Sequence, residues 1–148
     1  MKTSAVLTAA LAGLTLTGCS SVRSQLSHGR VPDVINEKPE RGSYYQAIGI
    51  GAGDSTLATE TQRRSLARDA AIVKAQYELL SLIKGVELKG GYTVSRAISV
   101  DSELATRVHN SIRGARVLKS EFTEDGGCVV TVRLPKEELR RETGLALP

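Results

Sequence analysis

Cys19 is the residue whose sequence surroundings most specifically predict a reaction. It follows Leu16, Thr17 and Gly18, and the small residues at positions 17 and 18 would admit a peptidase to the bond before the cysteine. The Cys19 thiol is a nucleophile that could then accept a diacylglycerol group. The four residues therefore predict a lipid attachment site, at which acyl chains contribute about 0.8 kcal/mol of membrane binding per buried CH₂ group.

The residues before this site have the composition of a secretory signal peptide. Lys2 supplies a short positive region, and residues 5–16 form an apolar stretch that only Thr and Gly interrupt. The stretch is too short to span a bilayer and has the length of a signal-peptide core. Because the sequence through Cys19 resembles the lipobox of bacterial lipoproteins, we expect residues 1–18 to be removed and Cys19 to be lipidated. The alternative is an ordinary secretory leader with a chance cysteine.

The residues after the cysteine indicate its destination and a linker. Ser20 stands where inner-membrane lipoproteins of enterobacteria typically carry Asp, so the resemblance implies the outer membrane, with the protein facing the periplasm. Residues 19–43 have scattered hydrophobic residues, mixed charges and two prolines, Pro32 and Pro39. We expect them to form the lipidated N-terminus and a flexible tether, which leads to one domain over residues 44–148.

Other residues that could take part in chemistry lack the partners that a reaction needs. Gly49, Gly51 and Gly53 follow a predicted strand, but the third glycine is one position early for a dinucleotide-binding loop and no Lys-Ser/Thr pair follows. His28 lies in the expected tether, and His109 lies on an expected helix beside Asn110 with no near acidic partner. No nucleophile elbow or His-containing metal spacing occurs in the sequence. We therefore expect a protein that is not an enzyme, with no catalytic site, metal or cofactor.

The second cysteine, Cys128, has no partner for an intramolecular disulfide once Cys19 is lipidated. Alternation places Cys128, Val130, Val132 and Leu134 on one face of a strand. This pattern favours a small buried hydrophobic residue over a reactive thiol. If the site is exposed, an intermolecular disulfide is the alternative.

The charge balance gives no special reason to expect a nucleic-acid partner. In 148 residues, 20 Lys and Arg against 16 Asp and Glu give a net charge of +4, with both signs interspersed. Aromatic residues make up 3% of the chain and include no Trp, which argues against stacking platforms for bases or sugars. A basic cluster of Arg107, Arg113, Arg116 and Lys119 could contact an acidic partner or a lipid phosphate, with a solvated surface as the alternative.

The elements that would position these residues follow from apolar alternation and from the placing of Gly and Pro. Strands are expected over residues 44–50, 86–94, 116–123 and 128–134, the last two forming a hairpin. Helices are expected from Ser55 or Thr59 to Lys84, from Asp101 as N-cap to Arg113, and from Pro135 at the first helical position to Arg141. The order β-α-β-α-β-β-α predicts a single small α+β domain with helices on one face of a small sheet.

The long helix has a candidate capping box, Thr59 and Gln62, and a candidate stop, Gly85. It carries more apolar surface than one sheet would cover. One stripe, expected to face the sheet, contains Leu66, Ala70, Val73, Tyr77 and Leu80. A second stripe, the candidate oligomer interface, contains Ile72, Leu79 and Ile83, and a third contains Ala67, Ala71, Ala75 and Leu82. We expect the second stripe to contact the next helix or a neighbouring subunit. The alternative is that alanines are good helix formers and that some of them are simply exposed to solvent.

Two segments of the chain resemble one protein family. They are residues 64–71, which continue through 75–80 and 85–86, and residues 112–120 before the hairpin. Together with the lipobox, they are similar to the small outer-membrane lipoproteins that include the flagellar assembly protein FlgP, over about residues 44–135. The family has no catalytic residues to carry over.

The resemblance implies a non-enzymatic building block of rings or disks beneath the outer membrane, around the flagellar motor, that is needed for motility. The implied partners are the outer membrane through the Cys19 lipid, further copies of the chain in a homo-oligomer, and other flagellar basal-body proteins. The residues leave a second hypothesis open, a monomeric envelope lipoprotein that faces the periplasm and has a binding or stress-related role.

Overall fold

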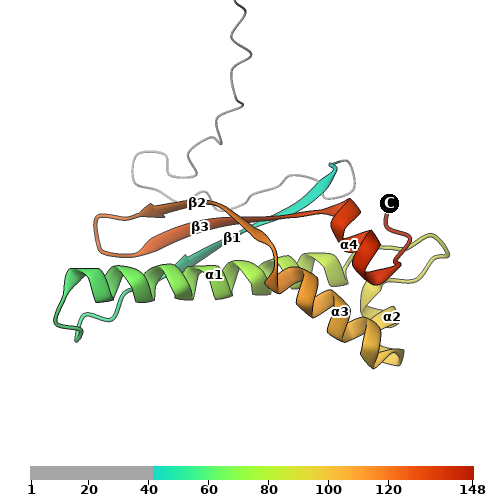
Figure 1. Cartoon of the computed structure of the whole chain (residues 1–148), viewed down its shortest axis with the longest axis horizontal. Coiled ribbons are helices and arrows are strands. Elements are labelled where there is room, and N and C mark those ends of the chain that lie inside the picture. The colour runs from blue at the N-terminus through green and yellow to red at the C-terminus, as the bar shows by residue number, and fades with distance from the viewer. Residues whose placement is uncertain (1–41) are drawn as a thin grey trace, which may run out of the picture.

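The computed structural model describes residues 42–148 and shows four helices and three strands in this part of the chain (Figure 1). In chain order they are β1 (Tyr44–Gly51), α1 (Glu60–Lys84), α2 (Val94–Val100), α3 (Ser102–Arg113), β2 (Arg116–Phe122), β3 (Cys128–Pro135) and α4 (Lys136–Thr143). The predicted α+β class is therefore confirmed. The predicted signal peptide and Leu16, Thr17, Gly18 and Cys19 lie outside the described residues.

The three strands form one antiparallel sheet in the order β1-β3-β2, which places β3 in the centre. β1 runs in unbroken register with β3, from Tyr44 opposite Pro135 to Gly51 opposite Cys128. β2 and β3 form the predicted hairpin, with a shift of register between Val117 and Lys119. In Figure 1, α1 runs along one face of this sheet, and α2 and α3 lie on the same side.

The start of α1 is the predicted capping box. The backbone N–H of Gln62 donates to the Thr59 hydroxyl at 3.2 Å, and the Thr59 N–H donates to Gln62 Oε1 at 3.4 Å. These two bonds satisfy donors that a helix N-terminus otherwise leaves unpaired. At the other end, Gly85 is the C-cap and has a right-handed conformation with φ of −77°.

The strand predicted over residues 86–94 is wrong. Glu87 and Thr93 form a single isolated bridge around Gly90 and Gly91, whose φ angles are +128° and +78°. The Thr93 hydroxyl then accepts from the Arg96 N–H at 3.3 Å and begins α2. The side-chain cap of Thr93 therefore turns the chain into a helix where apolar alternation alone predicts a strand, and the observed order is β-α-α-α-β-β-α.

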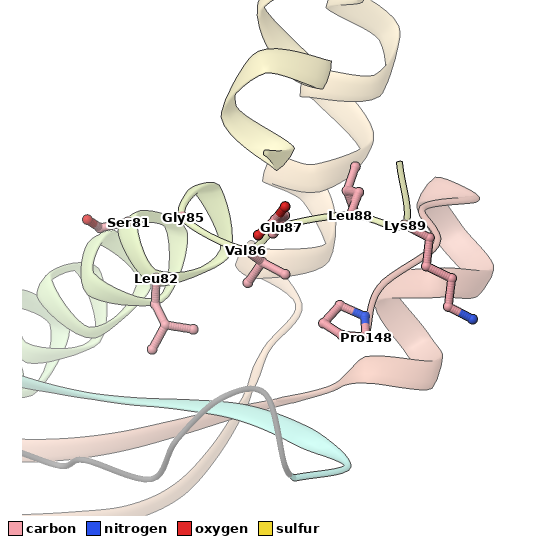
Figure 2. A pocket seen from close by; sticks show the side chains of 8 residues that line it. All are labelled: Ser81, Leu82, Gly85, Val86, Glu87, Leu88, Lys89 and Pro148. Carbon is pink, nitrogen blue, oxygen red and sulfur yellow. The ribbon is translucent and has the colours of Figure 1, made fainter. Parts of the chain in front are cut away.

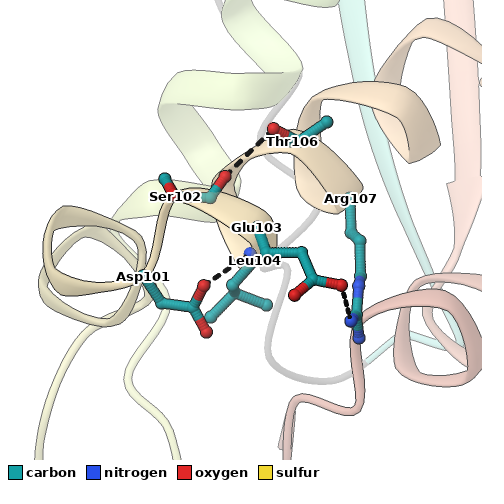
Figure 3. A network of polar contacts seen from close by, with 6 residues as sticks. All are labelled: Asp101, Ser102, Glu103, Leu104, Thr106 and Arg107. Atoms are coloured by element: carbon teal, nitrogen blue, oxygen red, sulfur yellow. Dashed lines mark hydrogen bonds and ion pairs between the residues drawn. The ribbon is translucent and has the colours of Figure 1, made fainter.

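The polar contacts that shape α3 include the predicted N-cap (Figure 3). The Asp101 carboxylate accepts from the Leu104 N–H at 2.9 Å, and Thr106 Oγ1 donates to the Ser102 carbonyl at 3.0 Å. Arg107 forms an ion pair with Glu103 one turn earlier. The short link at Asp101 lets α3 follow α2 at an angle, so that α3 packs beside α1.

The last helix differs from the prediction at both ends. Pro135 is the N-cap of α4, one position before the first helical residue, and it retains an extended φ and ψ. The helix continues past Arg141 to Thr143 and ends at Gly144, which has a left-handed φ of +73°. Pro135 is also the final residue of β3, so the chain passes from strand to helix without a loop.

Candidate functional site

The predicted oligomer interface on α1 lies largely in the core of the domain. Leu79 and Ile83 are 0% exposed and belong to one buried row with Ala67, Ala71 and Ala75. These two side chains have no surface to offer a neighbouring subunit, so the prediction is wrong for them. Ile72 is partly buried and packs against the same core.

The opposite side of α1 carries the exposed apolar side chains. Leu66, Val73 and Tyr77 are 44%, 65% and 64% exposed, and Ala70 between them is also exposed. Their spacing of four, three and four residues places all four on one side of the helix. We call these residues the α1 stripe. The prediction that this side faces the sheet is wrong, because the alanine row faces it instead.

The charges beside the α1 stripe pair with each other. Lys74 Nζ lies 2.6 Å from Glu78 Oε1 and 5.3 Å from the centre of the Tyr77 ring. The hydrogen bond to Glu78 raises the pKa of Lys74, which keeps the amine charged. Beside Tyr77 the border of the stripe is therefore locally neutral, and a surface that packs there needs no compensating charge.

A cleft of about 610 Å³ lies where α1 meets the following turn and the C-terminal segment (Figure 2). Its lining residues are Ser81, Leu82, Gly85, Val86, Glu87, Leu88, Lys89 and Pro148. In Figure 2 the side chains of Leu82 and Val86 point into the same space, whereas the amino group of Lys89 points away from it. The lining offers apolar contact, one hydroxyl (Ser81) and one carboxylate (Glu87). No hydrogen bond joins these two groups in the described residues, which suits binding better than catalysis.

A second depression, of about 290 Å³, lies between the start of α1 and the β2–β3 turn. It contains two cations, Arg63 and Arg64, but three carboxylates also line it. Arg63 Nη1 is already bonded to the Leu57 carbonyl at 2.6 Å, and Arg64 pairs with Glu60 at 2.7 Å. With the arginines occupied and carboxylates adjacent, the depression does not suit a phosphate group.

The glycines that precede this depression have a packing role. Gly49 and Gly51 lie within β1 and face the alanine row of α1. Asp54 caps the turn that follows, because its carboxylate accepts from Thr56 N and Thr56 Oγ1 at 2.8 and 2.7 Å. The Thr56 hydrogen bonds lower the pKa of Asp54, so a carboxylate stands where a phosphate-binding loop would present amide groups.

The remaining sequence candidates are dispersed. Cys128 is buried as predicted, and burial raises the pKa of its thiol. His109 lies on the exposed side of α3, and residues 42–148 contain no group of three or more side chains placed to hold a metal ion. Within the same residues, no helix is both long and apolar enough to cross a lipid bilayer.

The basic cluster is divided among separate ion pairs. Arg107 pairs with Glu103, Arg116 lies 3.7 Å from Glu138, and Lys119 lies 3.1 Å from Glu121. Arg116 and Lys119 belong to β2, whereas Arg107 belongs to α3. Three of its four members thus have an acidic neighbour, which favours the interpretation as a solvated surface.

Sequence patterns did not predict the burial of Lys136 against Tyr45. Tyr45 is 1% exposed, its hydroxyl has no hydrogen-bond partner in the described part of the chain, and burial raises its pKa to about 12. Lys136, 3% exposed, lies over its ring at 5.2 Å and donates to the Pro148 carbonyl at 3.1 Å. A Lys directly after Pro135 is typical of an exposed first helical turn, so no sequence signal predicts its burial.

No protein-family model and no curated protein matches the chain.

Proposed function

We propose that the protein is a non-enzymatic lipoprotein of the outer membrane, anchored through lipid on Cys19 and facing the periplasm. In this proposal its copies assemble into a ring or disk of the flagellar motor and support flagellar assembly and motility. The α1 stripe is the observation that supports self-assembly. The flagellar setting depends on the resemblance of residues 64–71, 75–80, 85–86 and 112–120 to the lipoprotein family that includes FlgP.

The α1 stripe suits association because its apolar side chains remain in water in the single domain. Leu66, Val73 and Tyr77 lie along three turns of one helix, and Ala70 between them allows close approach of another surface. Covering such a stripe removes apolar area from water, which stabilises the association by about 25 cal/mol per Å² of area buried. The stripe faces away from the sheet, so a second copy could reach it without unfolding the first.

The anchor would concentrate these domains in one plane. Residues 20–43 separate Cys19 from β1, and this linker can extend some tens of ångströms from the membrane. Copies held at one surface meet at a higher effective concentration than copies free in solution. Weak contacts between domains therefore suffice to build an assembly on the membrane.

The self-assembly part is tested with a soluble form that lacks residues 1–19. Val73→Glu places a charge on the α1 stripe and is expected to lower the sedimentation coefficient below that of the unmodified form. Ser65→Glu adds the same charge at an exposed position of α1 outside the stripe and is expected to sediment like the unmodified form. If both variants assemble equally, the stripe is not an interface.

The anchor is tested in cells that produce the full chain. Metabolic labelling with a fatty acid is expected to label the protein, whereas Cys19→Ala is expected to remain unlabelled because the acyl acceptor is missing. Label in the Cys19→Ala protein would contradict the lipid attachment site. Deletion of the gene from a flagellated host is expected to abolish swimming without slowing growth, and normal swimming would contradict the flagellar role.

A monomeric envelope lipoprotein with a binding role is the second candidate, and the cleft at Leu82 and Val86 is the observation that favours it. A cleft of about 610 Å³ falls within the size range of small-molecule sites. Leu82→Trp would fill it. If the Leu82→Trp protein still assembles but no longer restores the function that deletion of the gene abolishes, the result would favour the binding role over the structural one.

A further inference from the structure

The two edges of the sheet differ in how well they resist pairing with another strand. β2 has a shifted register between Val117 and Lys119, and it carries the charged residues Arg116, Lys119 and Glu121. Bulges and charged side chains on an edge strand are the usual devices that prevent edge-to-edge association. The β2 edge is therefore protected.

The β1 edge has none of these devices. Its eight residues, Tyr44–Gly51, include no charged residue and no proline. The strand keeps one continuous register with β3 along its whole length, without a bulge. A long, regular and uncharged edge of this kind is a template for another strand.

The hydrogen bonds between β1 and β3 show which backbone groups point outward. The Lys136 N–H donates to the Ser43 carbonyl at 2.9 Å, at the continuation of the β1–β3 ladder. Opposed residues in an antiparallel pair alternate between hydrogen-bonded and non-hydrogen-bonded positions. Ser43 occupies a hydrogen-bonded position, so every second residue after it also bonds to β3. The N–H and C=O groups of Gln46, Ile48 and Ile50, which lie between those positions, therefore point to the outer edge. At this edge the sheet of the described residues has no further strand.

The side chains of the same three residues also suit a paired strand. They lie on the sheet face opposite α1, since Gly49 and Gly51 between them face the helix. Ile50 is 54% exposed, and Ile48 is partly exposed. A neighbouring strand would cover both isoleucines while it satisfies the outward backbone groups.

We propose that β1 pairs in antiparallel orientation with β1 of a second copy, so that two three-stranded sheets become one continuous sheet. β1 is a suitable partner for itself because it has no charges, so no antiparallel register brings like charges together. A two-fold axis between the copies lets each strand donate and accept the same set of bonds. Pairing with β2 of the neighbour is disfavoured by the bulge and the charges there.

This proposal rests on the self-assembly proposed above and adds a second contact to it. The β1 edge lies at the side of the sheet, whereas the α1 stripe faces away from the sheet. A copy with two separate self-contacts can join two neighbours, whereas one two-fold contact would stop at a dimer. The β1 pair would therefore be one of two alternating contacts in an extended assembly.

The test uses the full lipidated chain in membranes, where lipid occupies the Cys19 sulfur and Cys128 is buried. Ile48→Cys, treated with a short bis-maleimide, is expected to yield a covalent dimer, because the two cysteines would lie near the two-fold axis. The matched control is Val117→Cys, which is 38% exposed on the opposite edge strand and is expected to yield none. Equal yields from both variants would overturn the proposal.

A third variant separates this proposal from the proposed function. If Val73→Cys on the α1 stripe crosslinks and Ile48→Cys does not, β1 pairing is overturned while self-assembly stands. If neither crosslinks, both are overturned. In the Ile48→Cys background, Ile50→Lys places like charges in the paired strands and is expected to lower the dimer yield about tenfold. A tenfold fall corresponds to a loss of about 1.4 kcal/mol in the free energy of pairing. Val117→Lys in the same background is expected to leave the yield unchanged, and an equal fall in both would overturn the proposal.

Discussion

Gly49 of β1 lies so close to Ala71 of α1 that a Cβ atom on Gly49 would be 2.0 Å from the Ala71 carbonyl oxygen. Gly51 has the same relationship with Ala67, at 2.1 Å. Because the opposing atoms belong to the helix backbone, no side-chain rotation could relieve either contact. The strand and the helix therefore meet at a distance that glycine on one side and alanine on the other permit, which gives the Gly-x-Gly spacing a structural cause.

Gly49→Ala is accordingly expected to destabilise the domain by about 1–3 kcal/mol or more, because an added methyl group must push α1 away from the sheet. The measurement is urea unfolding of the soluble form, followed by circular dichroism. Gly85→Ala is the matched control. Its φ is −77° and its nearest atom to an added Cβ is 3.5 Å away, so it is expected to change stability little. Equal effects from both substitutions would contradict the close contact.

The two sides of α1 are expected to respond differently to truncation. Leu79→Ala removes a side chain that is 0% exposed and is expected to lower the free energy of unfolding by about 2–5 kcal/mol. Val73→Ala truncates a side chain that is 65% exposed and is expected to change it by less than about 0.5 kcal/mol in the monomer. Similar losses at both positions, measured at a concentration where the protein is monomeric, would contradict the observed burial.

The orientation of α1 shows where sequence patterns fail. Leu66, Val73 and Tyr77 are larger than the alanines, so apolar area alone predicts that they face the sheet. The burial is set instead by the fit of small residues, since Ala71 can approach a strand only where that strand has Gly49. Gly49 and Ala71 lie far apart in the sequence, so the periodicity of apolar residues within the helix cannot predict that they fit together. Apolar area alone therefore places the candidate interface on the side that carries Leu79, which is 0% exposed in the domain.

Local signals were sufficient where the relevant contacts are themselves local. The Thr59 and Gln62 capping box, the Asp101 cap and the β2–β3 hairpin all involve near neighbours in the sequence, and the structure confirms each of them. The stretch from Val86 to Val94 has the alternation of a strand, but Val86, Leu88 and Val94 are buried around a turn and Tyr92 is 45% exposed. The Thr93 cap, three residues before Arg96, was the signal that could have predicted α2.

Cys128 is expected to be protected from alkylation in the folded domain. Its side chain is 0% exposed, and burial raises the pKa of the thiol, which lowers the fraction of reactive thiolate. In the soluble form without residues 1–19, maleimide is expected to react slowly in buffer and rapidly in urea. Fast labelling in buffer, or a dimer that only a reductant dissolves, would instead favour an exposed thiol with an intermolecular disulfide.

Tyr45 is expected to make the domain sensitive to alkaline pH. Burial raises its pKa from 10.0 to about 12, with a smaller opposing effect from the positive charge of Arg140. Between these two values the unfolded chain has lost the phenolic proton and the folded chain retains it, so the unfolded state binds fewer protons and the free energy of unfolding falls as pH rises.

Tyr45→Phe tests this account by removing a hydroxyl that has no hydrogen-bond partner among the described residues. Near neutral pH the substitution is expected to be neutral or slightly stabilising, because it no longer buries an unsatisfied polar group. Between about pH 10 and pH 12 its free energy of unfolding, measured in urea, is expected to fall less steeply than that of the unmodified protein. Parallel pH profiles would show that the hydroxyl is solvated in the folded domain, and a large loss at neutral pH would show that it has a partner.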